Sequence, residues 1–355
     1  MTRNAFKVYQ KSADLNLISP RRKRIDLLND RERALTLKLQ LQLDELEKCV
    51  SANQTFIDKI VQIAVDHFVP DEEIKWSPAT AIGLDKVRST LRQVAREWSE
   101  DGKLEREKSY GRVVEELCQR YPDRRDRHQV RVLVPGCGLG RLPFDLAYEG
   151  FQAQGNEFSY HMLFTSNLIL NSTSNAFEHV LHPYIHNFSN LRTRQDQTKQ
   201  IRVPDISPHT LSQHYAQDPD IPEDGLLSMT AGSFTQIYPM EDLPLFDAVA
   251  TIFFIDATPN IFTTLSTISA SLKSGGLWIN FGPLLWHYED MLPDGEDDDS
   301  SCGLEHSLED LIDLIPHFGF RFIKRESEQE CTYTRPPASM VYFNYQCEYW
   351  VAEKI

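Results

Sequence analysis

The chain has 355 residues, enough for one full α/β domain and an accessory domain of modest size. Its 37 basic residues against 52 acidic ones give a formal net charge of -15, which repels polyphosphate and argues against general nucleic-acid binding. The six cysteines are scattered and predict free thiols in a reducing compartment. No signal-peptide core and no long apolar run occur, so we expect a soluble, cytoplasmic protein without a membrane segment.

The first 125 residues predict an arm followed by helices. Residues 1–28 are polar and mixed in charge and predict a flexible polar arm, in which the basic run Arg21 to Arg24 is either a nuclear import signal or a solvated segment. Leucine at every second position from Leu35 to Leu43 has the period of a strand, but the surrounding strong helix formers favour a helix capped at residues 29 and 30. With further helices expected at 56–68, 86–98 and 110–117, residues 29–125 form a predicted helical N-terminal domain.

Residues 126–355 alternate between strand and helix patterns, which predicts an α/β fold with a Rossmann-like parallel sheet. Strands are expected at 130–134, 151–156, 226–229, 246–255 and 277–281, and an antiparallel pair at 320–324 and 341–351. Helices are expected at 142–148, 162–170 and 261–272, the last closed by a glycine cap at 273–276. The proline-rich stretch 192–225 predicts an insertion without a core, and the acidic run 294–299 a surface loop.

The first of these strands ends in a glycine-rich turn that predicts a nucleotide-cofactor site. Gly136, Gly138 and Gly140 let the backbone approach a ligand closely, and Glu157 follows the second strand, where a carboxylate accepts hydrogen bonds from ribose hydroxyls. A dinucleotide fingerprint requires its third glycine at position 141, which is Arg here. The spacing therefore favours S-adenosylmethionine, which has no pyrophosphate, over a dehydrogenase cofactor.

The later strands also end in residues that can serve a site at the same sheet edge. Phe234 either stacks on an adenine or belongs to the core. Asp256 follows an apolar strand, so it is either a functional acid or the N-cap of the next helix. His287 is either a site residue or a lone histidine, and the aromatic run 342–345 either walls a pocket or packs in the core.

Two other chemistries find no support in the sequence. The histidines His179, His182 and His186 could share a helical face, but Pro183 interrupts it, and we expect no metal site. No Gly-x-Ser-x-Gly elbow of a serine hydrolase occurs.

Taken together, six motifs resemble the carnosine N-methyltransferases from about residue 30 to the C-terminus. They are Val134-Pro-Gly-Cys-Gly-Leu-Gly-Arg-Leu142, Gly155-Asn-Glu-Phe-Ser159, Met162-Leu-Phe164, Ser228-Met-Thr-Ala-Gly232, Phe253-Phe-Ile-Asp256 and Gly282-Pro-Leu-Leu285. The resemblance implies a seven-stranded class I methyltransferase sheet with a helical N-terminal region, assembled as a homodimer. It also implies transfer of a methyl group from S-adenosylmethionine to the side-chain-proximal imidazole nitrogen of a histidine-containing dipeptide, carnosine becoming anserine.

Site residues follow from the same resemblance, position by position. The cofactor would be held by Gln93, Arg96, Gly136, Gly138, Gly140, Glu157, Ser233, Phe234 and Ile252, and the substrate by Asp256, His287 and Tyr345. The family commonly has an acid where Ser233 stands, so the contact with adenine is expected to differ there. Asp256, by accepting a hydrogen bond from the distal imidazole N–H, would fix the tautomer that leaves the proximal nitrogen free. The alternatives are a methyltransferase for protein histidine or another small amine, and a non-catalytic cofactor-binding scaffold.

Overall fold

The structure, a computed structural model, describes residues 2–68, 77–217, 226–238, 245–290 and 303–355, and divides into two compact units. The helical unit comprises Met1–Leu104, Tyr160–His209 and Tyr333–Phe343. The sheet unit comprises Glu105–Ser159, Thr210–Thr332 and Asn344–Ile355. The first segment of the helical unit ends at Leu104 rather than at the expected residue 125, and the unit also takes in two segments from later in the chain.

The chain begins with packed helices rather than with the flexible arm expected for residues 1–28. They are α1 (Thr2–Lys7), α2 (Tyr9–Ala13), a π-helical turn (Asp14–Ile18), α3 (Ser19–Asp26) and α4 (Asp30–Leu35). Phe6, Tyr9 and Ile18 are almost fully buried. The burial of these side chains stabilises the helices of an otherwise polar segment. The sequence-based expectation failed because it followed the polar and charged composition of this segment. The buried residues Ala5, Phe6, Tyr9, Ala13, Leu17 and Ile18 do follow helical spacing.

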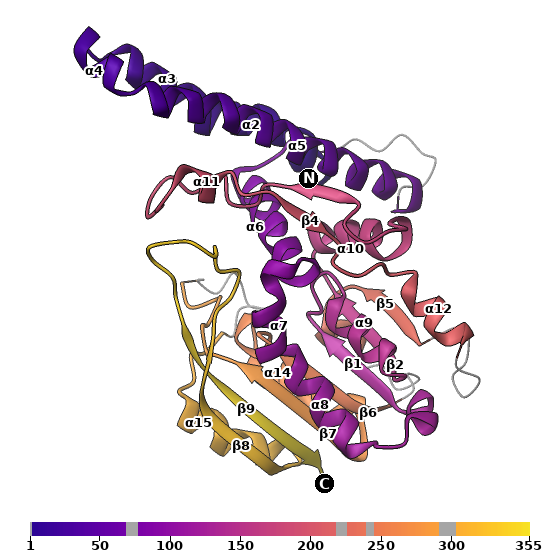
Figure 1. Cartoon of the computed structure of the whole chain (residues 1–355). Helices are drawn as coiled ribbons and strands as arrows, with labels where there is room; N and C mark the ends of the chain where they lie inside the picture. The colour runs from indigo at the N-terminus through magenta and orange to yellow at the C-terminus, as the bar shows by residue number, and fades with distance from the viewer. Residues whose placement is uncertain (1, 69–76, 218–225, 239–244, 291–302) are drawn as a thin grey trace. The chain divides into compact units, whose positions relative to one another are not determined.

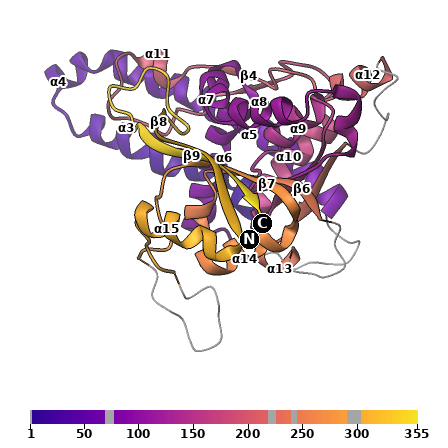
Figure 2. The same cartoon turned by 90° about the horizontal axis from the view of Figure 1, so that it is seen from below.

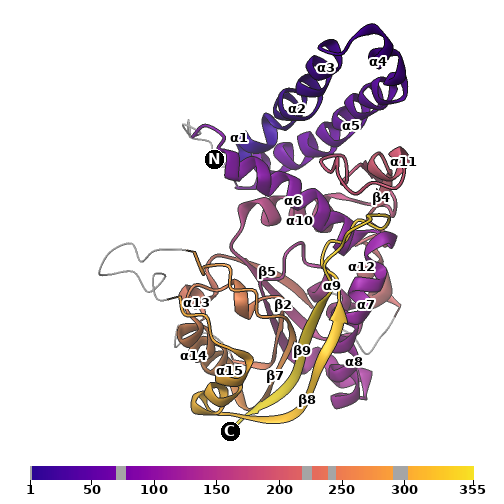
Figure 3. The same ribbon diagram turned by 90° about the vertical axis from the view of Figure 1, so that its left-hand side faces the viewer.

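Helix α5 (Leu37–Phe68) runs beside α1, α2 and α3, and α4 lies at the far end of this N-terminal hairpin (Figures 1 and 3). Asn29 caps α4 by accepting a hydrogen bond from the Glu32 N–H, while the Glu32 carboxylate accepts one from the Asn29 N–H. The predicted helix with its caps at residues 29 and 30 is confirmed, but it is interrupted at Thr36 between α4 and α5. Along α5, Leu43 and Leu46 are buried while Leu37 and Leu41 are exposed, so the leucine alternation does not mark a strand.

The remainder of the helical unit is built from α6 (Ala81–Trp98), α10 (Tyr160–Ser172), a short antiparallel pair and α11 (Arg194–Gln197). The antiparallel pair joins β3 (His179–Leu181) to β4 (Ile201–Val203). β4 and α11 fall inside the expected insertion 192–225, where Ile201 and Val203 are buried. The expectation that this stretch has no core was therefore wrong for its first part, and residues 218–225 lie outside the described residues.

Among its described residues, the sheet unit holds seven strands in the order β5-β2-β1-β6-β7-β9-β8 (Figure 1). They are β1 (Arg131–Pro135), β2 (Gln152–Glu157), β5 (Leu227–Ala231), β6 (Phe246–Ile252), β7 (Leu272–Gly282), β8 (Phe320–Cys331) and β9 (Tyr345–Lys354). The pairs among β5, β2, β1, β6 and β7 are parallel, and β9 is antiparallel to both of its neighbours. The carboxyl ends of the parallel strands and the start of β9 therefore meet at one edge, which we call the loop edge.

Helices cover both faces of this sheet (Figure 2). One face packs on α8 (Tyr110–Arg120), α9 (Arg141–Tyr148) and α12 (Thr210–Ala216), and the other on α13 (Phe234–Ile237), α14 (Ile261–Ser271) and α15 (Leu308–Leu314). Short connecting elements are α7 (Lys103–Lys108) and 3₁₀ turns at Glu100–Gly102, Arg124–Gln129, Ile255–Ala257 and Ile315–Phe318. None of the helices among the described residues is long and apolar enough to cross a membrane.

Three expected boundaries differ in the structure. β6 ends at Ile252 rather than at residue 255, because the next residue has a positive φ of 51° and the chain then turns. Residues 273–276 belong to a bulged start of β7, with Gly275 at φ 76°, rather than to a helix cap. Residues 341–344 precede β9 instead of belonging to it, and the acidic run 294–299 lies outside the described residues.

Candidate active site

The turn after β1 has the backbone geometry that only glycine adopts readily. Gly136, Gly138 and Gly140 have φ angles of 62°, 59° and 81°, all in the left-handed region, and Gly140 is the N-cap of α9. A Cβ built on Gly136 would overlap the Phe254 ring. The loop is therefore a cradle that side chains would fill, which suits close approach of a ligand to its backbone.

Glu157 at the end of β2 is tied directly to this loop. Its Oε2 accepts a hydrogen bond from the Gly138 N–H at 3.0 Å, and its Oε1 accepts from the N–H groups of Phe158 at 2.9 Å and Ser159 at 2.8 Å. Three amides thus hold a carboxylate that is 7% exposed. Glycine loop and acid form one rigid arrangement, which fits a cofactor that carries a ribose.

Three more predicted cofactor residues, Ser233, Phe234 and Ile252, lie at the loop edge of β5 and β6. Phe234 is 6% exposed and its ring meets the Phe254 ring edge-to-face, with centroids 5.6 Å apart. Phe254 in turn underlies Gly136, so Phe234 supports the glycine loop from the core. Ser233 is the N-cap residue of α13, and Ile252 is buried at the end of β6. Direct contact of these three residues with an adenosyl group remains a prediction.

Asp256 lies in the 3₁₀ turn after β6 and is 3% exposed. It is not a helix N-cap, because Asn260 caps α14. Its Oδ2 accepts a hydrogen bond from the Leu285 N–H at 2.9 Å, and its backbone carbonyl accepts one from the His287 N–H at 3.0 Å. Burial raises the pKa of Asp256, while the Leu285 amide and the nearby His287 oppose that rise.

The structure therefore brings Asp256 and His287 together, and it places Tyr345 at the same edge. His287 is exposed, and Tyr345 is half-buried at the first position of β9. The rings of Tyr345 and Phe253 meet edge-to-face with centroids 6.0 Å apart. Phe253 also donates its N–H to the Phe281 carbonyl at 2.9 Å, which connects β6 to β7 beyond the regular pairing. Asp256, His287 and the aromatic pair of Tyr345 and Phe253 form what we call the acceptor side of the site, where the methyl acceptor is expected. It combines a buried acid, an exposed imidazole and an aromatic wall.

The two remaining predicted residues lie on α6 in the helical unit. Gln93 donates a hydrogen bond to Glu97 Oε1 at 2.6 Å, and the Arg96 guanidinium lies over the Tyr333 ring, 4.6 Å from its centroid. Both side chains are buried. Their part in cofactor binding remains a prediction.

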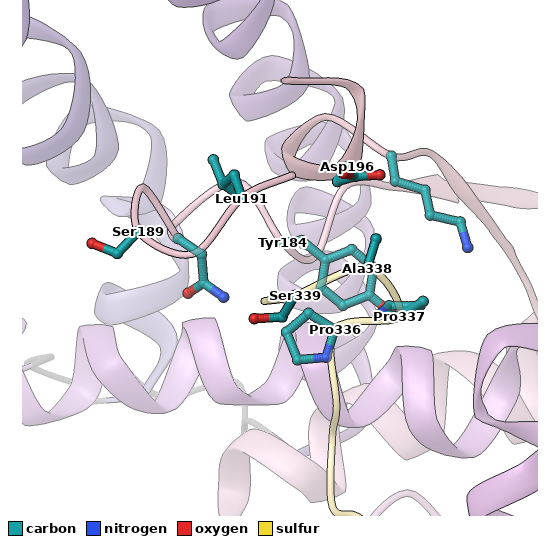
Figure 4. A pocket seen from close by; sticks show the side chains of 10 residues that line it. Tyr184, Ser189, Leu191, Asp196, Pro336, Pro337, Ala338 and Ser339 are labelled. Carbon is teal, nitrogen blue, oxygen red and sulfur yellow. The ribbon is translucent and has the colours of Figure 1, made fainter. Parts of the chain in front are cut away.

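The helical unit also has a small surface pocket (Figure 4). It is lined by Tyr184, Asn187, Ser189, Leu191, Asp196, Lys199, Pro336, Pro337, Ala338 and Ser339. Lys199 forms an ion pair with Asp101 at 2.6 Å. No residue expected to bind cofactor or substrate lines this pocket.

Sequence reasoning missed the residues that support the site. Phe254 underlies the glycine loop, Phe253 carries the aromatic wall, and Leu285 holds the Asp256 carboxylate through its amide. Two adjacent phenylalanines before an acid were a visible signal of a turn packed on both sides. A backbone donor such as the Leu285 amide leaves no signal in the residue type.

Fold and loop edge together define a class of protein. A glycine cradle, an acid after the second strand and a buried acid beside an aromatic wall, on a sheet with one reversed strand, make a class I methyltransferase that uses S-adenosylmethionine. A family model described as carnosine N-methyltransferase matches residues 73–355, and the chain belongs to that family.

Relatives from distant organisms agree with this assignment. The carnosine N-methyltransferase of Mus musculus is 36% identical over 357 residues, covering 99% of this chain and 84% of the relative. That of Schizosaccharomyces pombe is 40% identical over 314 residues, covering 87% of this chain and 82% of the relative. Among solved structures, magnesium protoporphyrin IX methyltransferase from Synechocystis with bound SAH matches with a TM-score of 0.37 and 11% identity, over 85% of this chain and 96% of that one.

Proposed function

We propose that this protein methylates the side-chain-proximal imidazole nitrogen of carnosine or a related histidine-containing dipeptide, giving anserine from carnosine. The observation that carries the proposal is the buried Asp256, held at the loop edge beside His287 in a chain of this family. Relatives named carnosine N-methyltransferase support the substrate class.

In this proposal one part of the loop edge binds the cofactor and the other part binds the methyl acceptor. Glu157 and the glycine loop would hold S-adenosylmethionine, whose sulfonium supplies an activated methyl group. Asp256 accepts a hydrogen bond from the distal imidazole N–H, which fixes the tautomer that leaves a lone pair on the proximal nitrogen. The Tyr345 and Phe253 rings wall the imidazole, and His287 contacts the polar part of the dipeptide. Catalysis then rests on orientation, because the methyl donor needs no further activation.

The experiment is to incubate the protein with labelled S-adenosylmethionine and a panel of acceptors. The panel contains carnosine, free histidine, a histidine-containing protein peptide and a small aliphatic amine. Labelling of carnosine well above the others supports the proposal. Preferred labelling of the peptide or the amine would assign the alternative methyltransferase function, and binding of S-adenosylmethionine without any transfer would assign a scaffold.

We also propose that the protein acts as a homodimer through the far end of its N-terminal hairpin. Leu27, Leu35, Leu37 and Leu41 are 86%, 81%, 60% and 60% exposed there, an apolar surface that a second copy would cover. Light scattering after gel filtration tests this. The double variant Leu37→Gln, Leu41→Gln should be monomeric, whereas Lys38→Gln on the same helix should leave the dimer intact. A wild-type monomer would refute the proposal.

A cytoplasmic location is the last part of the proposal. Within the basic run, the Arg21 guanidinium lies over the Phe188 ring at 3.3 Å from its centroid, and Arg22 forms ion pairs with Asp44 and Glu47. These contacts give Arg21 and Arg22 a role inside the helical unit, so we assign the run no import function. A tagged full chain should fill the cytoplasm. Nuclear accumulation that is lost on Lys23→Gln, Arg24→Gln would instead assign import to the run.

A further inference from the structure

The segment that carries His287 is held by an aromatic anchor that takes no part in the proposed chemistry. Trp286 lies directly between Leu285, whose amide binds the Asp256 carboxylate, and His287, whose amide binds the Asp256 carbonyl. Its indole Nε1–H donates a hydrogen bond to the His306 carbonyl at 3.1 Å. The indole also packs against the core cluster on the α14 face of the sheet.

His306 is fixed in turn by α14. The His306 ring meets the Phe262 ring edge-to-face with centroids 5.5 Å apart, and the Trp286 ring at 6.5 Å. Phe262 lies in the first turn of α14, whose N-cap is Asn260. The chain around His306 also packs closely on the same elements, since a Cβ on Gly303 would lie 3.3 Å from the Pro259 carbonyl oxygen and 3.6 Å from Tyr288 Cβ.

The geometry points to Trp286 and Phe262 as positioning residues for the acceptor side of the site. Both act through the His306 backbone and ring to hold residues 283–290 in the register at which two amides reach Asp256. Without the anchor, this segment populates other conformations, and an acceptor must first select the competent one. The apparent affinity for the acceptor falls in proportion to the fraction of molecules in the competent conformation. The turnover of the bound acceptor stays the same. This inference rests on the proposed roles of Asp256 and His287.

The first test measures the segment itself and needs no activity. Trp286→Phe keeps an aromatic ring but loses the indole donor to His306, so amide hydrogen exchange in residues 283–290 should quicken by about fivefold. The matched control is Trp278→Phe, which also loses an indole hydrogen bond, that from Nε1 to Thr251 Oγ1 at 2.8 Å, but lies in the sheet core. Exchange in residues 283–290 should be unchanged in the control. Equal exchange in Trp286→Phe and wild type would overturn the inference.

The second test separates positioning from general stability. In Trp286→Phe the KM for carnosine should rise with the loss of competent molecules, by up to about fivefold, while kcat and the affinity for S-adenosylmethionine stay at wild-type values. A merely destabilised enzyme would instead lose kcat at unchanged KM, because fewer molecules are active. Phe262→Ala should show the same rise in KM at unchanged kcat. Because the Phe262 ring is 37% exposed, this variant serves as the test if Trp286→Phe does not fold. An unchanged KM in both variants would overturn the inference. Wild-type protein inactive on carnosine would refute the proposed function alone, and the exchange measurement would still decide the inference.

Discussion

The glycine cradle permits a substitution whose cost can be worked out from two separate terms. In Gly136→Ala the new Cβ occupies a residue at φ 62°, which costs about 1 to 2 kcal/mol for a non-glycine residue. It also overlaps the Phe254 ring, and forcing extra volume into a packed site costs about 1 to 3 kcal/mol more. The expected loss of unfolding free energy is thus about 2 to 5 kcal/mol. The affinity for S-adenosylmethionine should fall as well, because the loop must shift.

Gly275 serves as a control that separates the cost of the overlap with Phe254 from the cost of the backbone strain. Gly275 has φ 76°, but the nearest atom to a Cβ there is Glu353 Oε1 at 4.0 Å, so Gly275→Ala should cost only the strain of about 1 to 2 kcal/mol. Urea unfolding and calorimetric titration with S-adenosylmethionine measure both variants. Adding Phe254→Leu to Gly136→Ala should recover part of the stability. Equal losses at the two glycines would refute the reasoning that a close approach to Phe254 shapes the loop.

Three further predictions concern the carboxylates and a buried histidine. Asp256→Asn should keep S-adenosylmethionine binding but lose about 100-fold in kcat on carnosine, and wild-type turnover would contradict the assigned role. Glu157→Gln removes a charged acceptor from three amides and should weaken S-adenosylmethionine binding at least about tenfold by titration, with intact affinity speaking against ribose binding. Burial lowers the pKa of His161 from 6.5 to about 4, so the unfolded chain takes up its proton first and stability falls as pH drops below 6.5. This group should cost about 2 kcal/mol at pH 5. Urea unfolding at pH 7 and pH 5 checks it, and His161→Phe should reduce the difference.

The cofactor half of the site was predictable because its signals are local. Glycine spacing after a β-branched run fixes both the turn and the cofactor class, and Glu157 follows at the end of the adjacent strand. The sheet followed from the same alternation of strands and helices. Asp256 could be identified as an acid after an apolar strand, but the choice between site residue and helix cap needed the structure, in which Asn260 takes the cap.

The predictions for residues 1–28 and for the first part of 192–225 failed because both segments are rich in polar residues or proline. Phe6, Tyr9, Ala13 and Leu17 follow helical spacing, but they lie in a segment whose charged and polar residues favoured the prediction of an arm. Ile201 and Val203 lie in a proline-rich stretch, which is typical of a loop. The anchor of the acceptor side was invisible for another reason. It joins Trp286 to the backbone of a residue 20 positions away, and no residue type signals such a contact.

The most direct test of the central claim is the position of the new methyl group. Carnosine incubated with the protein and S-adenosylmethionine labelled with ¹³C at the methyl group gives a product that NMR can assign to one ring nitrogen. The account predicts a single methyl on the nitrogen proximal to the side chain, which is anserine. A methyl on the distal nitrogen, or on the amine of the dipeptide, would contradict the role of Asp256 in selecting the tautomer.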